Sequence, residues 1–129
     1  MTRKKLPPLS RAQLEIMNVV WDRGETTVGE IFEILSARRP IARNTIQTTM
    51  VRLEEKGWLK HRQVANAFRY SSTVPREQTL GKMASELVDK AFGGSLEGLV
   101  MTLIEERGLT AGEADRIRKM IDESESKGS

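Results

Sequence analysis

The chain has 129 residues, 38% of them hydrophobic and 30% charged, which suffices for a modest core and excludes wholesale disorder. It contains no cysteine and a single histidine, His61, so disulfides, thiolate chemistry and multi-histidine zinc sites are excluded, and a reducing cytoplasm fits the composition. The net charge of +3 is uneven: residues 1–74 hold 13 Lys and Arg against 7 Asp and Glu, and residues 75–129 hold 8 against 11, so the first part suits a polyanion.

Residues 1–9 are predicted to form a basic arm that ends in two prolines, which block a helix and favour an extended lead-in. The cations of this arm either touch phosphates or belong to a solvated tail; they are Arg3, Lys4 and Lys5. A helix is predicted to follow, because Ser10 is a suitable N-cap, apolar residues recur at helical spacing as far as Arg23, and Gly24 is a typical stop.

A second helix is predicted over residues 28–38, and Pro40 separates it from a third that runs from Ile41 to Gly57. One face of the third helix is apolar, with Ile46, Met50, Val51 and Leu53 at the spacing of a buried stripe. Gly57 stands where a left-handed C-terminal cap is expected. A helix, a short turn and a further helix with a polar face make a helix-turn-helix.

The other face of the third helix carries no hydrophobic residue. Its members are Arg43, Asn44, Thr45, Gln47, Thr48 and Arg52. Amides, hydroxyls and guanidinium groups suit the edges of bases and phosphate oxygens. Asn44 is also predicted to be the N-cap, with Gln47 completing a capping box. The stretch is therefore predicted to be a DNA recognition helix, and the alternative is an ordinary amphipathic surface helix.

After the third helix the pattern changes to that of strands. Residues 58–63 and 67–71 are predicted to pair as a hairpin around the loop 64–66, with Phe68 and Tyr70 on one face of the second strand. A basic hairpin directly after a recognition helix is typical of the wing of a winged helix. Its cations are expected to reach backbone phosphates; they are Lys60, Arg62 and Arg69. The alternative is a plain solvated hairpin.

Pro75 marks the predicted boundary between a winged-helix DNA-binding domain, residues 1–74, and a helical domain, residues 75–129. The helices predicted in the second domain cover residues 77–92, 95–108 and 110–122, before a frayed polar tail. Because so few residues make a poor monomeric core, their apolar stripes are expected to pair with a second copy. The alternative is that they fold back on the winged helix. The expected interface residues are Leu80, Met83, Leu87, Leu96, Leu99, Val100, Leu103, Ile117 and Ile121.

Several of these stretches carry recognisable motifs. The run E-x-M-x-V-x-W extends from Glu15 to Trp21, and T-I-Q-T and R-L-x-x-K-G lie between Thr45 and Gly57. They are followed by F-R-Y-S-S-T-V and a helix-rich tail. Together these features resemble the penicillinase-repressor (BlaI/MecI/CopY) family of winged-helix regulators, over roughly residues 9–121. The resemblance implies a homodimer that binds inverted repeats overlapping promoters and represses transcription.

The residues that the resemblance places in the major groove are Asn44, Thr45 and Thr48. Two departures from the family pattern stand out. The copper-sensing branch has a cysteine-rich C-terminal metal site, and this chain has no cysteine. In the antibiotic-responsive branch a protease system inactivates the repressor by cutting between Asn and Phe in the helix before the last one. The aligned pair here is Thr102–Leu103, a substitution that departs from the cleavage pattern and leaves DNA binding untouched.

The predicted fold class is mainly α with a small β hairpin, an N-terminal winged helix-turn-helix followed by a three-helix dimerisation region. The predicted function is a cytoplasmic, sequence-specific transcriptional repressor that binds double-stranded operator DNA as a homodimer, with the antibiotic-responsive type and its regulatory protease as the finer reading. No catalytic residue, metal, cofactor or membrane is expected, because carboxylates scatter along helix faces and no apolar run is as long as a membrane span. The alternative is a winged-helix protein-interaction module without specific DNA readout.

Overall fold

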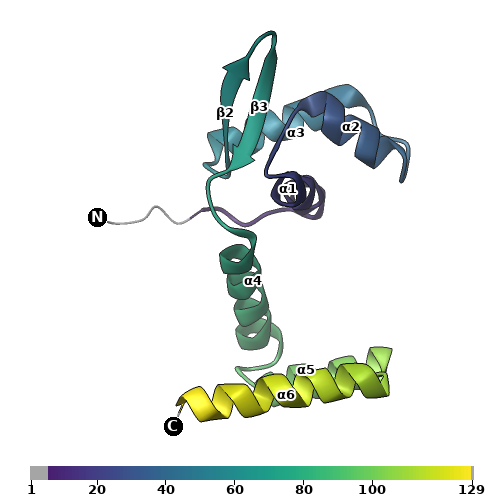
Figure 1. The fold of residues 1–129 in the computed structure, drawn as a ribbon, viewed down its shortest axis with the longest axis vertical. Coiled ribbons are helices and arrows are strands. Elements are labelled where there is room, and N and C mark those ends of the chain that lie inside the picture. The colour runs from purple at the N-terminus through teal and green to yellow at the C-terminus, as the bar shows by residue number, and fades with distance from the viewer. Residues whose placement is uncertain (1–5, 129) are drawn as a thin grey trace. The chain divides into compact units, whose positions relative to one another are not determined.

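The structure is a computed structural model that describes residues 6–128. Its elements, in chain order, are α1 (Arg11–Arg23), β1 (Glu25–Thr26), α2 (Val28–Ser36), α3 (Arg43–Glu55), β2 (Leu59–Val64), β3 (Ala67–Ser72), α4 (Arg76–Ala91), α5 (Leu96–Arg107) and α6 (Ala111–Gly128) (Figure 1). The mainly α fold class with a β hairpin is confirmed. The chain divides into two compact units, Met1–Gly81 and Lys82–Ser129, and the division falls within α4.

The first helix begins and ends where its sequence predicts. The Gln13 N–H donates to the Ser10 hydroxyl at 3.1 Å, and the Ser10 N–H donates to the Gln13 side chain at 2.9 Å, which is a complete capping box. At the other end Gly24 has φ +82, and its N–H donates to the Val20 carbonyl. In α2 the Thr27 hydroxyl accepts from the Glu30 N–H in the same way, and the helix ends at Ser36 rather than Arg38.

The start of α3 differs from its prediction. Ala42 is the N-cap and makes no side-chain hydrogen bond, so the capping box expected from Asn44 and Gln47 is wrong. The helix begins before Asn44, which frees both amides for other partners. Val51 was also predicted to be buried, but it is 42% exposed because it lies four residues from both Gln47 and Glu55, on the solvent face.

The end of α3 is a Schellman motif, which fixes how the chain enters the sheet. The Trp58 N–H donates to the Leu53 carbonyl at 2.9 Å, and the Gly57 N–H donates to the Glu54 carbonyl at 3.0 Å. Gly57 has φ +94, a backbone conformation that glycine adopts without strain, so the prediction of a left-handed cap at this residue is confirmed.

The sheet is antiparallel with the strand order β1-β3-β2. The first strand escaped prediction, because two residues are too few to show any periodicity. It pairs Glu25 with Ser71 and Thr26 with Tyr70. The hairpin is confirmed, although Val64 pairs with Ala67, so the connecting loop is one residue shorter than predicted.

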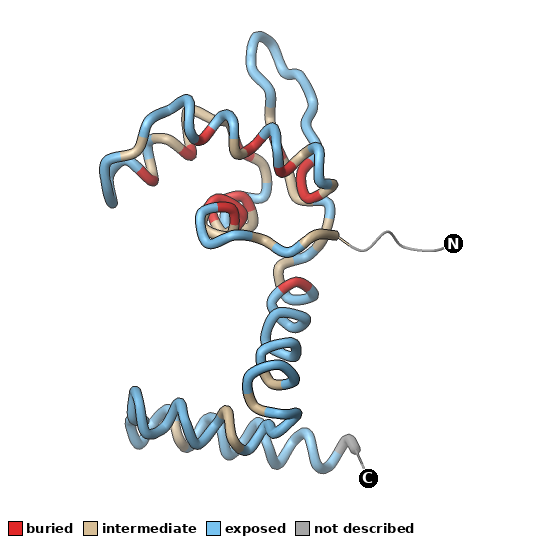
Figure 2. Tube along the Cα trace, turned by 180° about the vertical axis from the view of Figure 1, so that it is seen from behind, coloured by how far each residue is buried: buried red, intermediate tan, exposed pale blue. Residues whose placement is uncertain are grey.

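The core of the first unit lies where α1, α2 and α3 meet the sheet, as the buried segments in Figure 2 show. Its fully buried hydrophobic residues are Met17, Val20, Ile31, Leu35, Ile46, Met50 and Leu53. Trp58 belongs to this core and Trp21 packs against it, and both indole N–H groups are hydrogen-bonded. The Trp21 N–H donates to the Ser72 hydroxyl at 2.9 Å and the Val74 carbonyl at 3.0 Å, and the Trp58 N–H donates to the Pro7 carbonyl at 2.9 Å.

The second unit is helical and has no buried residue between Lys82 and Ser126. The Ser95 hydroxyl caps α5 by accepting from the Gly98 N–H at 2.9 Å. The Thr110 hydroxyl likewise accepts from the Glu113 N–H at 3.1 Å, in the first turn of α6. The frayed tail predicted after Asp122 is wrong, because α6 continues to Gly128 through glutamates and serines that carry only a small helix penalty.

Candidate nucleic-acid interface

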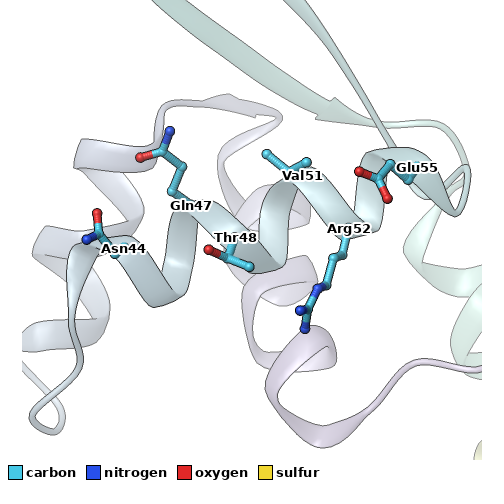
Figure 3. A pocket seen from close by; sticks show the side chains of 6 residues that line it. All are labelled: Asn44, Gln47, Thr48, Val51, Arg52 and Glu55. Atoms are coloured by element: carbon cyan, nitrogen blue, oxygen red, sulfur yellow. The ribbon is translucent and has the colours of Figure 1, made fainter.

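One face of α3 gathers most of the residues predicted to read DNA. A surface pocket along it is lined by Asn44, Gln47, Thr48, Val51, Arg52 and Glu55 (Figure 3). These residues follow one another at intervals of three and one, so they form a single stripe along the helix. The buried residues Ile46, Met50 and Leu53 fix the opposite side of α3 in the core. The stripe is therefore held by packing and open to a ligand.

The chemistry of this stripe matches the edges of base pairs. The amides of Asn44 and Gln47 each combine a donor and an acceptor, which is the pattern adenine presents in the major groove. Arg52 has the donor fork that suits guanine or a phosphate. Val51 adds an exposed apolar surface of the kind that contacts a thymine methyl. The sequence reading missed Val51, because its position next to Met50 suggested the core.

Two residues of the predicted site lie beside the stripe rather than on it. Thr45 lines a separate pocket with Glu15 of α1 and Arg39, whose side chains form an ion pair. Arg43 lies against α2, with its guanidinium 3.5 Å from the position a Cβ would take on Gly29. The structure thus brings four of the six predicted residues of α3 onto one face and places these two at its flanks.

The wing arginines share one face of the sheet. Arg62 and Arg69 are directly opposed across β2 and β3, and Lys60 is opposed to Ser71 on the same face. Lys60 is exposed and has no ion pair within the part of the chain that the structure describes. The three predicted cations are therefore brought together on one surface, on the two neighbouring strands β2 and β3.

Carboxylates from outside the hairpin form ion pairs with the two wing arginines. The Arg62 Nε and Nη2 both donate to Glu25, each at 2.8 Å. The Arg69 Nη1 lies 3.6 Å from Glu30, which also accepts from the Arg23 guanidinium at 2.7 Å. The hydrogen bond from Arg62 lowers the pKa of the Glu25 carboxyl, and the same bond raises the pKa of Arg62. Glu25 lies on β1, which is why no sequence pattern pointed to it.

The other face of the hairpin joins the wing to the last turn of α3. The His61 Nδ1 lies 2.7 Å from both carboxylate oxygens of Glu54. The His61 ring centroid is 4.4 Å from that of Phe68 and 5.5 Å from that of Tyr70. Phe68 remains 48% exposed. The wing is thereby fixed to the helix that carries the stripe.

The remaining predicted sites lie at the two ends of the chain. Arg3, Lys4 and Lys5 fall outside the described residues. The side chains predicted for the dimer interface are exposed apart from the half-buried Leu99. Thr102 and Leu103, the candidate cleavage pair, are exposed within the unbroken helix α5. Over residues 6–128, no helix is long and apolar enough to span a membrane, and no group of three or more His, Asp or Glu side chains is arranged to hold a metal ion.

A family model and curated relatives point to the same family. A family model described as penicillinase repressor matches residues 9–123. The chain is 32% identical over 124 residues to the transcriptional regulator BlaI of Mycobacterium tuberculosis (strain CDC 1551 / Oshkosh), covering 95% of this chain and 88% of that protein. It is 26% identical over 124 residues to the penicillinase repressor of Bacillus licheniformis, covering 96% of this chain and 97% of that protein.

A solved structure of a relative matches part of the chain. The solution structure of the Bacillus licheniformis BlaI monomeric form in complex with the blaP half-operator matches with 33% identity and a TM-score of 0.51. The match covers 58% of this chain and 92% of that one.

Proposed function

Because the chain belongs to the penicillinase repressor family, we propose that it is a sequence-specific DNA-binding transcriptional repressor that reads its operator with the exposed face of α3. The observation that carries this proposal is the stripe of amide, hydroxyl, guanidinium and methyl groups along α3, described above. The related BlaI was solved with a half-operator, and that match covers 58% of this chain. Proteins of this family are repressors rather than enzymes. The alternative of a winged-helix protein-interaction module has no support among these relatives.

DNA binding is assigned to residues 1–74 and dimerisation to residues 75–129. A half-operator bound by one copy of a relative implies an operator with two halves, which suits a two-fold homodimer. The exposed apolar side chains of α4, α5 and α6 support this assignment, because a small protein rarely leaves so much apolar surface in water. The operator proposed for this chain is therefore an inverted repeat.

A finer part of the proposal is that a regulatory protease inactivates the repressor by cutting it. The names of the relatives, which include penicillinase repressor, point to control of β-lactam resistance in those proteins. In this chain the pair aligned with the cleavage site is Thr102–Leu103, within α5. Because this pair departs from Asn–Phe, mass spectrometry of the protein after exposure of the cells to a β-lactam tests the point. A fragment ending at Thr102 would support a regulatory protease, and a chain that stays intact would contradict it.

Base readout is tested by comparing a selected duplex with a scrambled one. The duplex is obtained by selection from a random pool, and both are titrated over a range of salt concentrations. Replacing Thr48 by Ala should cost about 1–3 kcal/mol on the selected duplex and much less on the scrambled one, since only the first presents the matching base edges. Thr45→Ala, on the flank of α3, should cost less than Thr48→Ala on the selected duplex. Equal losses for Thr48→Ala on both duplexes would contradict readout by this face.

A further inference from the structure

The polar face of the sheet brings the cations of the hairpin close to carboxylates from outside it. Arg62 and Arg69 come from the hairpin, whereas Glu25 comes from β1 and Glu30 from α2. Each arginine faces one of these carboxylates, so most of the positive charge predicted for the wing is balanced within the protein. Lys60 is the exception, because no carboxylate of residues 6–128 forms an ion pair with it.

The two carboxylates are held in place by the backbone around them. Glu25 lies in β1, where its backbone pairs with Ser71 of β3. Glu30 lies in the first turn of α2, where its N–H donates to the Thr27 hydroxyl at 3.1 Å and its carboxylate accepts from that hydroxyl at 3.3 Å. These segments therefore hold the two carboxylates beside the arginines of the hairpin.

The ion pair with Glu25 takes up two of the N–H donors through which Arg62 could bind a phosphate. A guanidinium binds a phosphate or a carboxylate through the same two parallel N–H donors, and Glu25 occupies the pair formed by Nε and Nη2. A phosphate that approached Arg62 would also meet the negative charge of Glu25, which is one-third exposed beside it. Lys60 has no such carboxylate partner among the described residues, so its ammonium group is open to a phosphate.

We propose that Glu25 is an affinity-setting residue that keeps Arg62 as an internal brace between β1 and the hairpin, and that Lys60 is the wing cation that contacts phosphate. Glu30 plays the same part for Arg69, at the longer distance of 3.6 Å. Glu25 therefore lowers the sequence-independent attraction of the wing for duplex DNA. This inference rests on the proposed function, since it concerns how the same interface meets the phosphate backbone.

The test measures how binding to a scrambled duplex depends on salt for four variants. Replacing Glu25 by Gln should free Arg62 for one further phosphate, which steepens the salt slope by about 0.9 and makes affinity fall about 3.5-fold more than wild type over a fourfold rise in salt. The pair variant E25Q/R62Q should return to the wild-type slope. Lys60→Gln should flatten the slope by about 0.9. Glu33→Gln is the control, because this exposed carboxylate of α2 has no ion pair among the described residues.

The outcomes separate the inference from the function on which it rests. A salt slope for E25Q that equals the wild-type slope or is flatter would overturn the role proposed for Glu25. A slope for E25Q/R62Q as flat as that of K60Q would also overturn it, because Arg62 would then contact phosphate in the wild type. Matching changes in E33Q and E25Q would reduce the effect to net charge and overturn it as well. A wild-type protein that bound no duplex at all would instead overturn the proposed function, and the inference with it. Circular dichroism spectra that match the wild type establish that each variant is folded.

Discussion

Tyr70 is the single tyrosine of the chain, and it lies buried in β3, on the inner face of the wing. Burial raises the pKa of its hydroxyl, and the nearby Glu54 carboxylate raises it further. The same carboxylate contacts His61, whose ring lies beside that of Tyr70. The titration of Tyr70 therefore reports on the junction between the wing and the end of α3.

The raised pKa of Tyr70 predicts a loss of stability in alkali. Below the ordinary tyrosine pKa the hydroxyl is protonated in both the folded and the unfolded chain, so its contribution is fully present. As the pH rises through the raised pKa, the unfolded chain has already released its proton and the contribution is lost. Urea unfolding at increasing pH should therefore show a steeper decline for the wild type than for Tyr70→Phe. The absorbance of the phenolate gives the titration directly, and a midpoint at the ordinary pKa would contradict it.

Two glycines illustrate how the elements are delimited. Gly57 ends α3 with a positive φ, and a Cβ added to it would meet Leu6 at 3.0 Å. Gly81 lies inside α4, where an added Cβ would meet nothing within 4 Å. The first glycine is required by the geometry of the cap, whereas the second only weakens its helix.

Alanine at these two positions should change stability in opposite directions. Gly57→Ala should lower the free energy of unfolding by about 1–2 kcal/mol, because the residue must stay in the left-handed region and displace Leu6. Gly81→Ala should raise it by about 0.5–1 kcal/mol through higher helix propensity. Chemical denaturation of both variants and of the wild type measures these two changes in the free energy of unfolding. A change of the same sign in both would mean that Gly81 also serves the packing of α4.

Local signals made most of the elements predictable. Serine and threonine caps, glycine stops and apolar spacing located the helices, because these features act within a few residues of one another. The stripe on α3 was largely predictable for the same reason. The Glu25–Arg62 pair was not, since its partners are 37 residues apart and one lies on a two-residue strand. Val51 was misplaced because spacing alone does not show where a buried stripe ends.

At the scale of the whole molecule, α5 has more apolar surface than one stripe requires. Leu96 is 65% exposed, and Met101 is exposed on a different side of the helix from Leu103. A helix that is apolar over much of its circumference is typical of one covered by several neighbours. The second unit of a single copy supplies only α6 and part of α4 as neighbours, which favours a second copy as the remaining cover.

A charge placed in this surface should dissociate the proposed dimer. Leu103→Asp would put an unpaired carboxylate into the interface, which a dimer accommodates only at high cost. Thr102→Asp is the matched control, because it adds the same charge on the polar side of α5. Light scattering should give a dimer mass for the wild type and the control and a monomer mass for Leu103→Asp.

The monomer would hold one half-site and lose the gain from engaging two linked half-sites, so its affinity for the full operator should fall. The core of the first unit contains neither substituted residue, so the first unit of both variants should remain folded. A wild type with the mass of a monomer would overturn the proposed assembly. A Leu103→Asp variant that keeps the dimer mass would place the interface elsewhere.

The location of the two tryptophans gives the two units different optical signatures. Both tryptophans of the chain, Trp21 and Trp58, lie in the first unit, where their N–H groups are bonded to residues distant in the sequence. Their emission follows the first unit alone, whereas far-ultraviolet dichroism follows the helices of both. A melting step that appears in the dichroism at low protein concentration, and is silent in the emission, therefore originates between Lys82 and Gly128.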